Sequence, residues 1–171
     1  MIEPPSGLKA RPTTDLARES LLNILNNRYD FAEISLLDLF AGTGAISYEF
    51  ASRGTDDIDL VETERRYCEF ISSTIRKLGI SNARVHRIDV RDFLKVCHKQ
   101  YDIIFADPPY DIPWLREIPE LVFRSGAVKD KSLFILEHPK SYSFTNHPQF
   151  TGHRNYGSVN FSFFKPLNAF I

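Results

Sequence analysis

The sequence is poor in cysteine and has no long apolar run, and both absences narrow the class of protein. Its two cysteines, Cys68 and Cys97, stand in separate segments without the spacing of metal ligands, which predicts free thiols in a cytoplasmic protein. No run of about 18 apolar residues occurs, so the sequence predicts no membrane-spanning helix. The first residues, MIEPPSGLKA, lack the apolar segment of a secretory signal peptide.

Acidic residues are missing from the last part of the chain, although the whole chain is nearly neutral. Lys and Arg number 21 against 22 Asp and Glu, a net charge of −1, which does not indicate a strongly basic nucleic-acid-binding protein. Residues 138–171 nevertheless contain no Asp or Glu, but carry Lys140, Arg154, Lys165 and three histidines. This stretch is either a chance run or one face of the domain left open to phosphate groups.

The composition is that of a packed globular domain. The chain has 171 residues, of which 43% are hydrophobic and 14 are Phe, and it shows no repeat, linker or low-complexity segment. We therefore expect a single domain over residues 1–171.

Strand-like and helix-like segments alternate along the chain. Short apolar runs predict strands at 35–40, 58–62, 83–88, 101–106 and 132–137. Helical patterns lie before and between them, at 15–27, 45–54, 67–78, 90–99 and in a segment that begins at Pro113 and is divided at Pro119. This alternation predicts a doubly wound α/β fold with a parallel sheet and helices on both faces. Residues 153–165 favour a final hairpin around Gly157, with a loop as the alternative.

The segment DLFAGTGAIS, residues 38–47, joins the first predicted strand to its helix. Gly42 and Gly44 would let a ligand approach the backbone, but Ser47 stands where the dinucleotide-binding pattern has its third glycine. Glu62 ends the second strand, 20 residues after Gly42, where an acidic residue can accept hydrogen bonds from both ribose hydroxyls. The pattern predicts a site for an adenosine cofactor, with a plain tight turn and an exposed strand end as the alternative.

Asp38, on the strand before this loop, separates two classes of cofactor. A carboxylate there would repel a pyrophosphate, whereas it would favour the ammonium and sulfonium groups of S-adenosylmethionine. Asp89 and Val90 follow the third strand, where ligands of this architecture bind, and they could meet the adenine. Asp89 is equally well placed to be the N-cap of the next helix.

The segment ADPPY, residues 106–110, follows the fourth strand. An exocyclic amine is a poor nucleophile, and acceptors aimed at its N–H bonds favour the tetrahedral geometry that it needs for attack. Asp107 offers a carboxylate and Pro108 a carbonyl without a competing N–H, while Tyr110 can stack on a flat substrate. This chemistry needs positioning but no metal. The alternative is a strand that merely ends in a proline-rich turn.

In their order, RPTTDLARESLLNIL (11–25), the glycine segment and ADPPY resemble the RsmD-type Rossmann-like methyltransferases. These enzymes use S-adenosylmethionine to methylate the exocyclic N2 of a guanine in small-subunit (16S) ribosomal RNA. The resemblance covers residues 11 to about 165 and implies about seven strands, mostly parallel, with a C-terminal antiparallel hairpin. It implies a site made of Arg11, Thr13 and Thr14 near the methionine end of the cofactor, Asp38, Phe40, Gly42 and Gly44 around it, Glu62 on the ribose, Asp89 and Val90 on the adenine, and Asp107, Pro108, Pro109 and Tyr110 on the target base.

The same resemblance implies a monomeric enzyme whose partner is ribosomal RNA or the assembling small subunit. Family members usually carry a basic, glycine-containing segment before the RPT motif, whereas only ten residues with one Lys precede Arg11 here. We therefore expect residues 1–10 to be a disordered or truncated N-terminal segment. The alternatives are a DNA adenine-N6 or protein glutamine-N5 methyltransferase, a nicotinamide-dependent oxidoreductase and a non-catalytic nucleotide-binding module. Asp38 counts against the oxidoreductase, and Asp107 against the protein-directed enzymes, which usually have Asn there.

Overall fold

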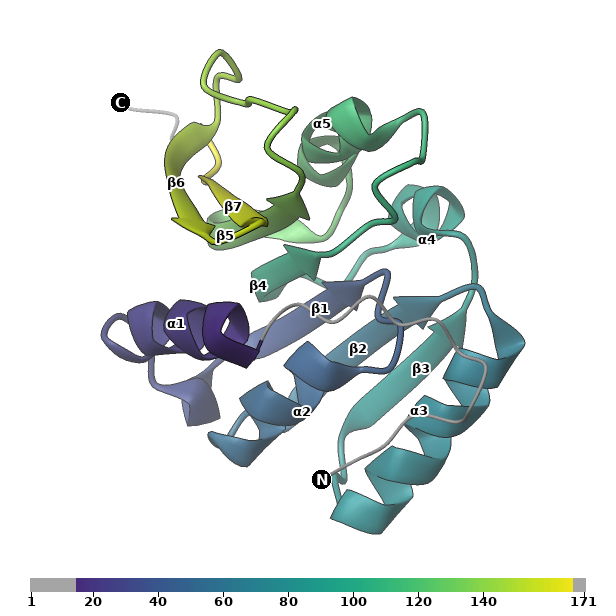
Figure 1. The fold of residues 1–171 in the computed structure, drawn as a ribbon. Helices are drawn as coiled ribbons and strands as arrows, with labels where there is room; N and C mark the ends of the chain where they lie inside the picture. The colour runs from purple at the N-terminus through teal and green to yellow at the C-terminus, as the bar shows by residue number, and fades with distance from the viewer. Residues whose placement is uncertain (1–14, 168–171) are drawn as a thin grey trace.

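A seven-stranded sheet forms the centre of the computed structural model, which describes residues 15–167 (Figure 1). The order of the strands is β3-β2-β1-β4-β5-β7-β6. The strands are β1 (Ser35–Leu39), β2 (Asp57–Glu62), β3 (Ala83–Arg87), β4 (Tyr101–Ala106), β5 (Val128–His138), β6 (Phe150–Tyr156) and β7 (Val159–Phe164). The first five pair in parallel, while β7 is antiparallel to both β5 and β6. The predicted fold class and the C-terminal hairpin are confirmed.

Helices cover both faces of this sheet (Figure 1). They are α1 (Asp15–Asn26), α2 (Ala45–Ser52), α3 (Arg65–Leu78), α4 (Val90–Val96) and α5 (Ile118–Arg124). The first three pack on one face around buried side chains such as Phe50 and Ile71. The other two pack on the opposite face around side chains such as Phe93 and Val122. Within residues 15–167, none of these helices has the length and apolar character needed to span a membrane.

Two local predictions differ from the structure. Pro113 does not begin a helix, because the chain first makes a 3-10 turn at Leu115–Glu117. The helix α5 starts at Ile118 with Pro119 in its first turn, where the missing N–H of proline leaves no hydrogen bond unmade. The strand β5 begins at Val128, four residues before the predicted start, because its polar first half still pairs with β4 across an irregularity in the register.

An ion cluster around one buried aspartate stabilises the other end of the sheet, away from the candidate site. Asp59 in β2 is 2% exposed and accepts hydrogen bonds from four side chains, those of Arg84, His86, Lys99 and Tyr101. Burial raises the pKa of Asp59, but these hydrogen bonds outweigh it and hold the pKa well below its ordinary value. The cluster joins β2, β3 and the start of β4.

The order of the strands places the two candidate loops at one edge of the sheet. The direction of winding reverses between β1 and β4, and in sheets of this kind ligands bind at that point, beyond the carboxyl ends of the strands. Asp38 pairs in register with Phe105, and Leu39 with Ala106. The glycine segment that follows β1 and the ADPPY segment that follows β4 are therefore neighbours.

Candidate functional site

The glycine segment after β1 turns sharply and is tied to the end of β2. Phe40, Gly42 and Gly44 have φ of 58°, 57° and 82°, in the left-handed region that favours glycine. The Ala41 N–H donates to the carbonyl of Val61 over 2.9 Å. The loop residues before Gly44 are half-buried, and α2 starts directly after Gly44.

Glu62 closes the loop from the neighbouring strand. Its Oε1 accepts a hydrogen bond from the Gly42 N–H at 2.9 Å, and its Oε2 accepts one from the Glu64 N–H at 2.8 Å. A carboxylate has about four acceptor positions, so further donors can still reach it. Glu62 therefore links the glycine loop to the start of α3 and lies at the edge where the ribose is predicted to bind.

Asp38 is an acid enclosed by the fold. It is 1% exposed, and the Ser47 hydroxyl donates to its Oδ2 over 2.6 Å. The pKa of Asp38 is raised to about 8, because burial raises it, the Ser47 hydrogen bond lowers it only in part, and the nearby charges of Asp107 and Glu62 also raise it. Three carboxyl groups thus gather at the ends of β1, β2 and β4. Such a cluster favours a cationic ligand and opposes an anionic pyrophosphate.

The ADPPY segment leaves β4 beside this cluster. Pro108 is buried, Pro109 is exposed, and Asp107 and Tyr110 are half-buried. The backbone turns immediately afterwards, where the Ile112 N–H donates to the Pro109 carbonyl at 3.4 Å. The structure thus brings the carboxyl group and the proline carbonyls to the same edge as the glycine loop.

An aromatic contact that the sequence analysis missed fastens the two loops together. The ring centroids of Phe40 and Trp114 are 5.7 Å apart, and the guanidinium carbon of Arg91 lies 4.5 Å from the centroid of Trp114. Phe40 belongs to the glycine loop, Trp114 follows ADPPY, and Arg91 belongs to α4. Aromatic residues near the segment were visible in the sequence, but the partner of each depends on the order of the strands.

Asp89 has the structural role that the sequence offered as the alternative to cofactor binding, that of a helix N-cap. It is the N-cap of α4, its Oδ1 accepting from the Arg91 N–H at 2.8 Å, and the Arg91 guanidinium lies 3.1 Å away. The hydrogen bond from Arg91 holds the pKa of Asp89 below its ordinary value. Val90 is buried. Contact of either residue with adenine stays a prediction.

Three predicted residues, Arg11, Thr13 and Thr14, lie outside the described residues. Within the described part of the chain, no group of three or more His, Cys, Asp or Glu side chains is arranged to hold a metal ion.

Comparison with known proteins gives a family and several named relatives. The family model described as conserved hypothetical protein 95 matches residues 1–165. Ribosomal RNA small subunit methyltransferase D of Escherichia coli strain K12 is 32% identical over 133 residues, which are 78% of this chain and 66% of that protein. The protein of the same name from Buchnera aphidicola subsp. Baizongia pistaciae is 33% identical over 127 residues, 74% and 64% of the two chains. The chain thus spans just under two thirds of the length of these relatives.

Solved structures with the same fold cover more of their own length. The putative methyltransferase yhhF from Escherichia coli superposes with a TM-score of 0.78 at 28% identity, over 91% of this chain and 86% of that one. A hypothetical protein of Thermus thermophilus superposes with a TM-score of 0.84 at 29% identity, over 97% and 93%. This chain therefore shares its overall fold with these two solved structures.

Proposed function

Because the chain belongs to the family described as conserved hypothetical protein 95, we propose that it is an S-adenosylmethionine-dependent methyltransferase of ribosomal RNA. The observation that carries the proposal is the meeting of Asp38, Glu62 and Asp107 at the ends of three neighbouring strands. A cluster of carboxyl groups beside a glycine loop suits a cationic, phosphate-free cofactor. The relatives named ribosomal RNA small subunit methyltransferase D support RNA as the substrate.

The chemistry of the residues present fits this cofactor, because Glu62 and Asp107 are acidic and a bound cation would favour the ionised form of Asp38. Asp38 and the glycine loop would hold its methionine part, Glu62 its ribose, and Asp89 with Val90 its adenine. When bound, S-adenosylmethionine would supply a methyl group that its sulfonium already activates. The protein then needs to bind the cofactor and the target base, to orient them and to exclude water, and it needs no strong base.

The target group in this proposal is the exocyclic N2 of a guanine in small-subunit ribosomal RNA. Asp107 and the Pro108 carbonyl would accept hydrogen bonds from the amino group and hold its lone pair toward the methyl donor. Tyr110 would stack on the base once it has left its own stack. Residues 1–171 would act as one domain, as a monomer in the cytoplasm, on free ribosomal RNA or on the assembling small subunit.

The deciding experiment offers radiolabelled S-adenosylmethionine to four substrates separately: naked small-subunit ribosomal RNA, assembled small subunits, duplex DNA and protein. We expect label in ribosomal RNA or in the subunit RNA, recovered as N2-methylguanosine after nuclease digestion. Label in DNA adenine or in a protein glutamine would refute the substrate, and no label anywhere would favour a binding module. Protection against heat by NADH, without protection by S-adenosylmethionine, would indicate an oxidoreductase.

Asp107→Asn is the variant that tests the role of the carboxylate. It keeps the size of the side chain but loses the charge-assisted acceptor, so methyl transfer should fall by about 10²- to 10³-fold, as when one donor or acceptor of a preorganised site is removed. The rise in melting temperature that S-adenosylmethionine produces should persist in the variant. Full turnover in Asp107→Asn would rule out the proposed orientation of the amine.

A further inference from the structure

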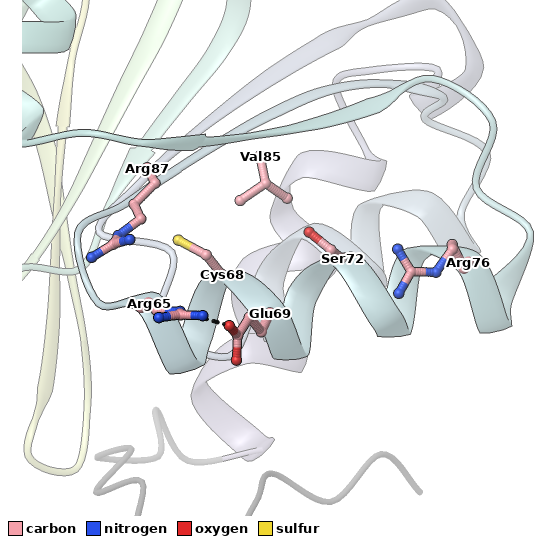
Figure 2. A pocket seen from close by; sticks show the side chains of 7 residues that line it. All are labelled: Arg65, Cys68, Glu69, Ser72, Arg76, Val85 and Arg87. Carbon is pink, nitrogen blue, oxygen red and sulfur yellow. Dashed lines mark hydrogen bonds and ion pairs between the residues drawn. The ribbon is translucent and has the colours of Figure 1, made fainter.

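A groove lies outside the candidate site, between α3 and the outer strand β3. It encloses about 450 Å³ and is lined by Arg65, Cys68, Glu69, Ser72, Arg76, Val85 and Arg87. The helical members fall on one stripe of α3, and the other two project from the same face of β3. Figure 2 shows Arg65 and Arg87 at one end of the groove and Arg76 at the other.

The lining of the groove is strongly basic for a chain of net charge −1. It contains three arginines and one acid, Glu69, which Arg65 holds at 2.8 Å (Figure 2). Arg87 donates from Nε to the carbonyl of Thr63 at 3.4 Å. Over residues 15–167, no carboxylate forms an ion pair with Arg76 or Arg87, so the positive charge of both is available to a ligand.

One end of the groove opens at the edge of the sheet that carries the candidate site. Arg65 is the first residue of α3 and follows Glu64, whose N–H donates a hydrogen bond to Glu62 of the candidate site. Arg87 is the last residue of β3. From β3 to β4 there are three strand spacings in the observed order, which amount to about 14 Å. Arg76 lies 11 residues beyond Arg65 along α3, or about 16 Å at the helical rise. The groove thus extends along α3 from the edge of the sheet that carries the candidate site, near Arg65, to Arg76.

We propose that this groove binds the sugar–phosphate backbone of the RNA strand that flanks the target nucleotide. The inference rests on the proposed function, because it names a second contact of the same substrate. Arginine presents a planar fork of donors that matches phosphate, and contacts with phosphates supply most of the sequence-independent affinity for a nucleic acid. A row of arginines with gaps between them suits a chain of phosphates better than a single small anion.

The test compares two neighbouring residues of α3, one that lines the groove and one that does not. Arg76→Gln removes a charge from the lining, whereas Lys77→Gln removes the same charge from the next, exposed position outside it. Binding to a naked small-subunit ribosomal RNA fragment is measured from about 50 to about 200 mM salt. One lost phosphate contact lowers the slope of log affinity against log salt by about 0.7 to 0.9, so the loss of affinity should be about threefold larger at the lower salt concentration than at the higher one.

A second pair reverses the charge instead of removing it. Ser72→Glu places a carboxylate in the middle of the groove, and Ser73→Glu places one beside it, outside the lining. We expect Ser72→Glu to bind the RNA more weakly than Ser73→Glu at every salt concentration, and by several-fold at the lowest. The melting temperatures of all four variants, with and without S-adenosylmethionine, should match the wild type and so report intact folding.

Failure of this inference differs from failure of the proposed function. Equal salt slopes for Arg76→Gln and Lys77→Gln, with equal affinities for the two glutamate variants, would overturn the groove as an RNA site while the wild type still methylates ribosomal RNA. The groove would also be ruled out as an RNA site if Arg76→Gln bound an acidic peptide or assembled subunits more weakly than Lys77→Gln but bound naked RNA equally well. That result would favour a protein partner. A wild type that neither binds nor methylates ribosomal RNA would refute the proposed function, and this inference with it.

Discussion

Asp38 should destabilise the folded protein at neutral pH, and Asp38→Asn should therefore be more stable than the wild type. The pKa of Asp38 rises from an ordinary value of 3.8 to about 8, first because of burial, against the lowering effect of Ser47. The folded state then holds a proton at pH 7 that the unfolded chain has released. About three pKa units separate the ordinary value from pH 7, and at about 1.4 kcal/mol for each unit the difference is about 4 kcal/mol.

The sign of the effect fixes how it depends on pH. Since the folded pKa is above the unfolded one, the destabilisation is absent below about pH 4, grows with pH and is complete above about pH 8. The amide group that Asp38→Asn introduces cannot ionise, and its oxygen can still accept from Ser47. The advantage of the variant over the wild type should accordingly increase by about 4 kcal/mol between pH 5 and pH 8.

Urea denaturation at pH 5 and pH 8 measures this difference directly. Asp130→Asn, at an exposed position of β5, is the matched control, and its stability relative to the wild type should change little with pH. The stabilised variant should also lose the rise in melting temperature that S-adenosylmethionine gives to the wild type. An Asp38→Asn protein that is no more stable than the wild type at pH 8 would refute the assignment of a buried, protonated acid.

Two further predictions concern the other carboxylates. Glu62→Gln replaces one acceptor oxygen by a donor, so it should lose one of the two backbone hydrogen bonds and most of the thermal shift caused by S-adenosylmethionine, with a loss of about 1–3 kcal/mol in urea denaturation; an unchanged thermal shift would remove Glu62 from the ribose site. Asp59→Asn should cost about 1–3 kcal/mol at pH 7 because the buried side chain loses its charge-assisted hydrogen bonds from Arg84 and Lys99, which are partly exposed and keep their ion pairs with Asp57. As the folded pKa of Asp59 is lowered, its contribution is present above about pH 4 and disappears below it, and a cost that did not shrink at low pH would contradict this account.

The succession of strands and helices and the location of the candidate site followed from local sequence patterns. Alternating apolar runs and helical stripes predicted β1 to β4, and because parallel strands present their carboxyl ends at one edge, Asp38, Glu62 and Asp107 were expected to meet there. The start of α5 was misplaced because both Pro113 and Pro119 suit a first helical turn, and packing of the intervening 3-10 turn decides between them.

Contacts between segments that are distant in the chain could not be predicted from such local patterns. Asp38 was interpreted as a charged carboxylate beside the glycine loop, whereas its burial beneath Ser47 raises its pKa, and only the packed structure shows this. The packing of Trp114 against Phe40 and Arg91 unites three segments far apart in the chain. The arginine groove likewise requires β3 to lie at the outer edge next to α3, while the basic stretch noted in residues 138–171 is a different region.

In the proposed function, the hydrogen bond from the Gly42 N–H to Glu62 has a consequence for the kinetics of cofactor exchange. Together with the bond from Ala41 to Val61, it holds the glycine loop in its turn through contacts within the protein alone. The conformational entropy of ordering this loop is therefore lost during folding and is not subtracted from the free energy of binding. Because the loop is already ordered, differences in affinity among variants of the loop should be expressed in the residence time of the ligand, with association rates nearly unchanged.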